Sequence, residues 1–178
     1  MQIVFETHQQ TEDNEAGIAT GWLPGRLSAN GRSQAAELGV RRRSDGLDAV
    51  FSSDLARAVE TVDIAFAGFE IPVLLDWRLR ECDYGELNGM PRDRVHANRL
   101  AQLETPFPGG ESWHQAVARV GRFLSDLQPR WDGARLLVIG HVATHLGLEV
   151  HLRRTPLTDA LSADFMWQPG WEYLLETA

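Results

Sequence analysis

The stretch Ile3-Val4-Phe5-Glu6-Thr7-His8-Gln9-Gln10-Thr11 decides how the rest of the chain is organised. Its apolar start is typical of a buried strand, and His8 follows where that strand ends, just before a turn. Open α/β sheets expose reactive groups at the carboxyl ends of their strands. A second apolar run, Leu136-Leu137-Val138-Ile139, delivers His141 to a similar position. The two runs predict that His8 and His141 share one site, with His8 as the first candidate for a nucleophile.

Composition limits the class of protein. The chain has 178 residues, 43% of them hydrophobic and 24% charged, so we expect one globular domain over residues 1–178. No apolar run is long enough to cross a bilayer and no secretion signal is visible, so we expect no membrane partner and a cytoplasmic location. The net charge of -8 argues against nucleic-acid binding, which relies on a positive field.

The cysteine and arginine content limits the chemistry further. Cys82 is the single cysteine, so it cannot form an internal disulfide, and it makes no cluster with histidine at metal-ligand spacing. We therefore expect no metal and no cofactor. All 17 basic residues are arginine, which we interpret as a coding bias rather than a binding role. With the net charge negative, an anionic substrate needs a local positive pocket.

Strand and helix patterns alternate along the chain. Strands are expected over residues 2–6, 48–52, 71–75, 135–139 and 171–175, and helices over residues 28–43, 54–66, 92–103, 113–127 and 143–152. Ser28 and Asp54 are expected to cap their helices, and Pro72 places its strand at an edge or a strand start. This alternation predicts an α/β three-layer sandwich, a mainly parallel sheet with helices on both faces.

Two segments interrupt the alternation. Residues 11–27 form a long loop, and residues 77–112 are interpreted as a substrate-facing insertion of the single domain. An edge strand or the Trp-containing tail could pair between chains, so a homodimer stays open.

Four chemistry-bearing residues fall at or just beyond predicted strand ends: His8, Arg57, Glu81 and His141. Each has a plain structural alternative, since a lone histidine is often a surface group, Glu81 could be a solvated loop carboxylate and Arg57 a surface ion pair. Chance would rarely place all four at one edge of a sheet. Their placement therefore favours a catalytic site.

The motifs around these residues resemble the histidine phosphatase superfamily, in its phosphoglycerate mutase-like group, over nearly the whole chain. Thr7-His8-Gln9-Gln10-Thr11 with Asn14 is similar to the first motif, in which arginine and glycine flank the histidine. Ser52-Ser53-Asp54-Leu55-x-Arg57-Ala58-x-x-Thr61 is nearly a full match to the second motif. Leu79-Arg80-Glu81-x-x-Tyr84-Gly85 resembles the acid-bearing segment, and His141 fits the last motif.

The resemblance implies a phosphoglycerate mutase-like fold and phosphoryl transfer through a phosphohistidine on His8. In this mechanism Arg57 and His141 donate hydrogen bonds to the phosphoryl oxygens, and Glu81 protonates the leaving oxygen and then activates water. The expected reaction is hydrolysis of a small phosphomonoester, so the expected partner is a phosphorylated small molecule. The substrate-binding positions implied are Thr7, Gln9, Asn14, Thr20, Gly21 and Val142.

Three positions depart from the family pattern. Thr7 replaces an arginine, and Gln9 and Val142 replace glycines. Losing one charge-assisted contact to phosphate costs roughly 1.5–3 kcal/mol. Either another donor supplies the charge, or the pocket serves a less charged substrate or another reaction, or the domain binds without catalysis. The candidate donors are Arg80, Arg26 and the amides of Gln9 and Gln10.

Mutase activity is less favoured than hydrolysis. Cys82-Asp83 follow the acid where mutases carry basic side chains, and Asp83 would repel a second phosphate group. Trp22, Trp77 and Trp113 either line an apolar subsite or pack in the core and at the rim.

Overall fold

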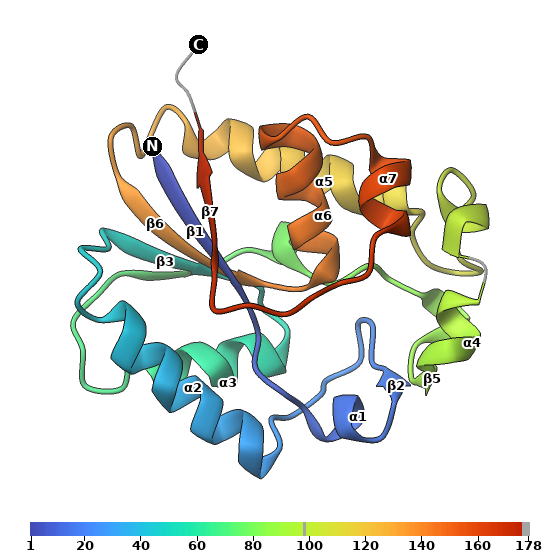
Figure 1. Cartoon of the computed structure of the whole chain (residues 1–178), viewed down its shortest axis with the longest axis horizontal. Coiled ribbons are helices and arrows are strands. Elements are labelled where there is room, and N and C mark those ends of the chain that lie inside the picture. The colour runs from blue at the N-terminus through green and yellow to red at the C-terminus, as the bar shows by residue number, and fades with distance from the viewer. Residues whose placement is uncertain (98, 176–178) are drawn as a thin grey trace.

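The computed structural model describes residues 1–97 and 99–175 (Figure 1). Its main sheet has the strand order β4-β3-β6-β1-β7. The strands are β1 (Gln2–Thr7), β3 (Ala49–Ser52), β4 (Val73–Leu75), β6 (Arg135–Gly140) and β7 (Trp171–Leu174). The first four pair in parallel, and β7 pairs antiparallel with β1. The expected mainly parallel sheet is confirmed, with the Pro72-led strand at an edge.

Helices cover both faces of the sheet (Figure 1). α2 (Ala29–Arg42) and α3 (Ala56–Ala65) lie on one face, and α5 (Trp113–Leu127) and α6 (Val142–Leu152) on the other. Alternate residues of β1 serve the two layers, since Val4 packs with α2 and α3 while Ile3 and Phe5 pack with α5 and α6. The predicted three-layer sandwich is confirmed. Within the described part of the chain, no helix combines the length and apolarity needed to cross a bilayer.

One of the two predicted caps is wrong. The Ser28 hydroxyl accepts from the Gly31 N–H and caps α2 as expected. At α3, however, the N-cap is Leu55, and the Asp54 carboxylate instead receives two hydrogen bonds of 2.7 Å from Arg80. A bidentate charge-assisted pair is stronger than a bond to one helix N–H, so it determines where the Asp54 side chain points.

The two irregular segments meet in a small second sheet. The loop over residues 11–27 contains α1 (Glu12–Glu15) and β2 (Ile18–Ala19), and β2 pairs antiparallel with β5 (Met90–Pro91) of the insertion. The insertion also contains η1 (Trp77–Leu79) and η2 (Gly85–Leu87). This pairing brings the insertion beside the first loop.

Two helix predictions need correction. The single helix expected over residues 92–103 is instead the short α4 (Arg92–His96) followed by η3 (Arg99–Gln102), with residue 98 outside the described part. Only Val95 of α4 is buried, so no continuous apolar face supports a longer helix. α7 (Leu157–Ser162) was not predicted, although Leu157 and Leu161 are spaced to bury one helical face.

Candidate active site

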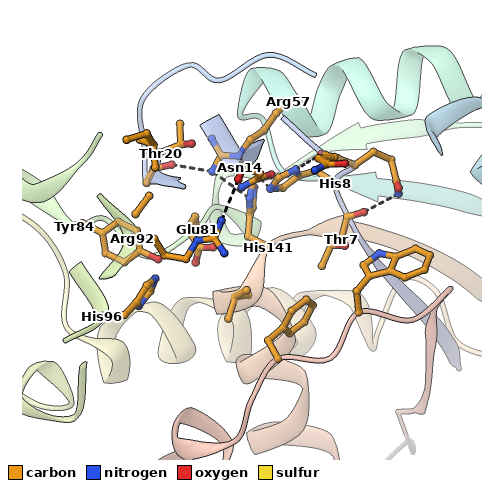
Figure 2. Close-up of a pocket in the computed structure, with 18 of the residues that line it drawn as sticks. Thr7, His8, Asn14, Thr20, Arg57, Glu81, Tyr84, Arg92, His96 and His141 are labelled. Atoms are coloured by element: carbon orange, nitrogen blue, oxygen red, sulfur yellow. Dashed lines mark hydrogen bonds between the residues drawn. The ribbon is translucent and has the colours of Figure 1, made fainter. Parts of the chain in front are cut away.

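A cavity of about 710 Å³ lies at the carboxyl ends of β1 and β6. Parallel pairing aligns these ends, and the His8 N–H donates to the Gly140 carbonyl over 2.9 Å. The structure brings together all ten residues that the sequence singled out. The cavity is lined by Thr7, His8, Gln9, Asn14, Thr20, Gly21, Arg57, Glu81, His141 and Val142, together with residues of the insertion and the tail (Figure 2).

His8 is held as a neutral imidazole whose Nε2 carries the lone pair. Its Nδ1 lies 2.7 Å from the Gln9 carbonyl, and because a carbonyl can only accept, Nδ1 carries the hydrogen. Nε2 then accepts from Arg57 Nε at 3.3 Å. Burial, with the nearby Arg57 charge, lowers the pKa of His8 to about 3. The ring is therefore in the state that a nucleophile requires.

Arg57, in the first turn of α3, links His8 and His141 (Figure 2). Its Nη2 donates to the Gly21 carbonyl at 2.8 Å and to His141 Nδ1 at 3.2 Å, while Nη1 donates to the Leu23 carbonyl at 3.2 Å. The side chain is buried, so its charge is poorly screened by water. One guanidinium thus orients both rings and places a positive charge between them.

His141 is the second neutral imidazole. Because its Nδ1 accepts from Arg57, its Nε2 carries the hydrogen and donates to Ser53 Oγ at 2.9 Å. Burial and the Arg57 charge hold the pKa of His141 well below its usual value. The ring centroids of His8 and His141 are 4.9 Å apart. Both nitrogens of His141 are engaged, so donation from Nε2 to a substrate oxygen requires its bond to Ser53 to open.

Glu81 faces the amino end of α6. Its Oε1 accepts from the N–H groups of Cys82 at 2.8 Å and Ala143 at 3.0 Å. Burial raises the pKa of Glu81, and those two hydrogen bonds and the Arg57 charge oppose the rise. The net effect is a raised pKa, which is the direction of shift that a proton donor needs.

Sequence reasoning missed Arg119, which holds the backbone of the Glu81 segment. This fully buried arginine of α5 donates to the carbonyls of Arg78, Arg80 and Glu81, each at 2.7 Å. Its remaining donors reach the two Glu111 carboxylate oxygens at 2.9 and 3.0 Å. All five N–H groups of the guanidinium are used, so the position of Glu81 depends on a side chain outside the cavity.

Gln9, just after β1, and Gly21, in the first loop, make two further contacts. The Gln9 amide folds back, and its Nε2 donates to the Thr7 carbonyl at 3.2 Å. Gly21 adopts φ +55°, and a Cβ there would lie 1.8 Å from Asn88 Oδ1, so only glycine fits. The Gly21 carbonyl that this turn exposes is the one that holds Arg57.

The other two loop positions are fixed by their own hydrogen bonds. Asn14 forms a capping box with Thr11 at the start of α1. Thr20 donates from its hydroxyl to Asp13 at 2.8 Å. Both side chains belong to the cavity wall, and their contact with substrate stays a prediction.

The replacement cations suggested by the sequence lie elsewhere. Arg80 is paired with Asp54 and covers the Trp22 ring at 4.6 Å, and Arg26 is an exposed partner of Glu12. Neither lines the cavity. Two arginines that sequence reasoning missed do line it, namely Arg92 and Arg99 of the insertion.

Figure 2 shows Arg92 among the side chains that line the cavity. Its Nη2 donates to the Asn14 carbonyl at 3.2 Å. The small sheet formed by β2 and β5 explains this placement, because it joins the insertion to the first loop. A positive charge is therefore present in the pocket despite Thr7.

The structure corrects the expectation for Asp83 and agrees with the packing interpretation of three tryptophans. Asp83 does not line the cavity; its Oδ1 accepts from the Gly85 N–H and the Asn88 amide, so repulsion of a second phosphate by Asp83 is unsupported. Among the tryptophans, Trp113 is buried in the core, Trp22 donates to the Glu81 carbonyl, and Trp77 is half exposed. None of these three belongs to the cavity wall, so the packing interpretation holds.

Comparisons with known proteins agree with this geometry. Residues 3–165 match the histidine phosphatase superfamily (branch 1). A 2,3-bisphosphoglycerate-dependent phosphoglycerate mutase of Methylobacterium radiotolerans is 35% identical in an alignment of 155 positions that covers 78% of this chain and 73% of the mutase. Among solved structures, Bacillus stearothermophilus YhfR superposes with a TM-score of 0.86 at 26% identity, covering 96% of this chain and 89% of that one. A mycobacterial glucosyl-3-phosphoglycerate phosphatase with VO3 superposes with a TM-score of 0.82 at 27% identity, covering 96% and 90%.

Proposed function

Because this chain belongs to the histidine phosphatase superfamily, we propose that it hydrolyses a small phosphomonoester through a phosphohistidine on His8. The observation that carries the proposal is the tautomer of His8. Its Nδ1–H is committed to the Gln9 carbonyl, so Nε2 carries the lone pair, which accepts from Arg57 Nε at 3.3 Å in the cavity that also contains Glu81.

The first step transfers the phosphoryl group to the enzyme. His8 Nε2 attacks phosphorus in line, a nitrogen–phosphorus bond forms, and the bond to the ester oxygen breaks. Glu81 gives its proton to that oxygen, which leaves as an alcohol. Arg57 turns its Nε–H from His8 to an equatorial oxygen, where charge develops.

The second step releases phosphate. The Glu81 carboxylate accepts a proton from a water molecule as its oxygen attacks phosphorus. The nitrogen–phosphorus bond breaks, inorganic phosphate leaves, and His8 returns to its neutral tautomer. The Gln9 carbonyl supports both steps because it holds the Nδ1–H throughout.

Arg92 and Arg99 support an enzyme over a binding domain without catalysis. They return to the pocket the positive charge that Thr7 does not provide, and the four catalytic side chains are present in one cavity. Of the three explanations for the altered first motif, replacement of the charge by other residues is therefore the one we favour.

Phosphoglycerate mutase activity is the second candidate. The name of the Methylobacterium relative points to it, and two arginines in the cavity suit a substrate that carries a second anionic group. Asp83 no longer argues against it, because its carboxylate is bonded within its own turn.

The decisive experiment follows the fate of the phosphoryl group. Wild type, His8→Ala and the exposed-histidine control His114→Ala are incubated with p-nitrophenyl phosphate, and an acid-labile phosphoenzyme is trapped. We expect phosphoenzyme and turnover in wild type and His114→Ala, and neither in His8→Ala. Equal background rates in all three would refute hydrolysis at His8.

A second incubation separates the two candidate functions. 3-Phosphoglycerate is supplied with 2,3-bisphosphoglycerate and the products are read by phosphorus NMR. Accumulation of inorganic phosphate supports hydrolysis, whereas accumulation of 2-phosphoglycerate shows a mutase.

A further inference from the structure

The cavity has two walls of different chemistry. Arg92 and Arg99 of the insertion form a cationic wall. Phe165 and Trp167, from the segment between α7 and β7, form an aromatic wall. Neither aromatic side chain is needed for the steps at His8, so their presence requires another explanation.

The two aromatic rings are held differently. Phe165 packs its ring against His145 at 5.7 Å and against Trp171 at 5.6 Å between centroids, so it is anchored to the core. Trp167 makes no ring contact with any residue that the structure describes, and 55% of its surface is exposed. It therefore presents an open aromatic face at the cavity.

Three consecutive apolar side chains are exposed in this segment, as they are along β4. Phe165, Met166 and Trp167 are 38%, 76% and 55% exposed, and they follow one another in the chain. Exposed apolar patches of this kind mark binding surfaces. Because two of the three line the catalytic cavity, the patch is continuous with the site of the chemistry.

A second cavity of about 240 Å³ adjoins the first. Arg99, Val142 and Phe165 line both cavities, so Val142 and Phe165 form the partition between them. The rest of the second wall is largely apolar, with Leu146, Ala160, Leu161, Met166 and Trp171. Apolar surface thus extends from the mouth of the catalytic cavity past Val142.

We propose that the substrate is a phosphomonoester of a flat aromatic alcohol, whose ring stacks on Trp167 and packs against Phe165 and Val142. Its phosphate lies at His8 and Arg57, so the inference rests on the proposed function for the phosphate end only. Stacking on an open indole and packing against an anchored phenyl ring favour a planar apolar group over a polar chain.

The inference is tested by binding without turnover. Calorimetry compares 1-naphthylmethylphosphonate with methylphosphonate, two compounds that cannot be hydrolysed because carbon replaces the ester oxygen. We expect the naphthyl compound to bind wild type more tightly by about fivefold or more. Trp167→Ala should abolish most of that advantage, while Trp77→Ala should retain it. Trp77 is the matched control because it is 48% exposed and does not line the cavity.

Three results would overturn the inference. These are equal affinities for the two phosphonates, no measurable binding of the naphthyl compound, and an advantage that survives Trp167→Ala. No bond is broken in this assay, so it is independent of hydrolysis. If the protein hydrolyses simple esters but shows no preference for the naphthyl compound, only the inference of an aromatic substrate is refuted. A protein that binds the naphthyl compound through Trp167 but turns over no ester fails only the proposed function.

Discussion

The Nε of Arg57 donates to the Nε2 of His8 over 3.3 Å, so the cation touches the very nitrogen proposed to attack phosphorus. The contact favours the neutral ring, because a protonated Nε2 would face a positive charge. It also means that the guanidinium is already beside the place where phosphoryl oxygens would arrive. The resting geometry therefore joins nucleophile and charge stabiliser in one hydrogen bond.

Replacing Arg57 by lysine should remove this arrangement while keeping the charge. An ammonium group cannot reach His8, His141 and the Gly21 carbonyl together, because it lacks the planar fork of the guanidinium. We expect kcat to fall by about 10²–10³ in Arg57→Lys, measured with p-nitrophenyl phosphate. Arg26→Lys, at an exposed arginine outside the cavity, is the control and should retain its rate. A loss of less than tenfold in Arg57→Lys would show that charge alone suffices.

Glu81→Gln should affect substrates according to their leaving group. An alkyl alkoxide needs a proton as it leaves, whereas p-nitrophenolate leaves without one. We expect a loss of about 10²–10⁴ in kcat/KM for β-glycerophosphate and a much smaller loss for p-nitrophenyl phosphate. Equal losses for both substrates would contradict a proton-donor role.

The pH dependence should follow Glu81 rather than His8. With a pKa of about 3, His8 is already neutral above pH 5 and adds no acidic limb there. Burial raises the pKa of Glu81. As the pH rises through this raised pKa, Glu81 loses the proton that it would donate, so kcat/KM for β-glycerophosphate should fall. The fall should be absent in Glu81→Gln. If kcat/KM of the wild type instead rose with pH where the Glu81→Gln variant is flat, Glu81 would not be the proton donor.

Arg92→Met should weaken phosphate binding. Arg92 lines the cavity, and one charge-assisted contact contributes roughly 1.5–3 kcal/mol, so the Ki of inorganic phosphate should rise about tenfold or more. Arg94→Met is a matched control on the same short helix, because Arg94 is exposed and does not line the cavity. Similar Ki values for the two variants would show that the charge missing at Thr7 is supplied elsewhere.

Arg119→Met should destabilise the fold and misplace Glu81. The change removes the cation paired with Glu111 and the donor to the Arg78 and Arg80 carbonyls, and breaking a buried pair in this way costs about 3–5 kcal/mol of unfolding free energy. Urea denaturation measures this loss. The double variant Arg119→Met/Glu111→Leu should recover part of it, since no uncompensated charge stays buried. A single-variant loss below about 1 kcal/mol would mean that water replaces the guanidinium.

The sequence alone predicted the layers and the residues that gather at one end of the sheet. The apolar runs of β1 and β6 are continuous because both faces of those strands are covered, and parallel pairing brings their carboxyl ends together. His8 and His141 had to meet for that reason. Arg119 also left a signal, since it is spaced with Ala116 and Phe123 on the buried face of α5, where an arginine requires partners.

Only the tertiary structure decided which cations and which aromatic groups face the site. Arg92 lies in the cavity because β2 pairs with β5, and that two-residue pairing has no periodicity that could be read from the chain. Arg80 does not line the cavity because it is paired with Asp54. Trp167 reaches the cavity from a segment without regular structure. Contacts between distant loops depend on individual partners rather than on a hydrophobic pattern. The strand pattern therefore predicted that His8 and His141 meet, whereas the residues around them could be read only from the tertiary structure.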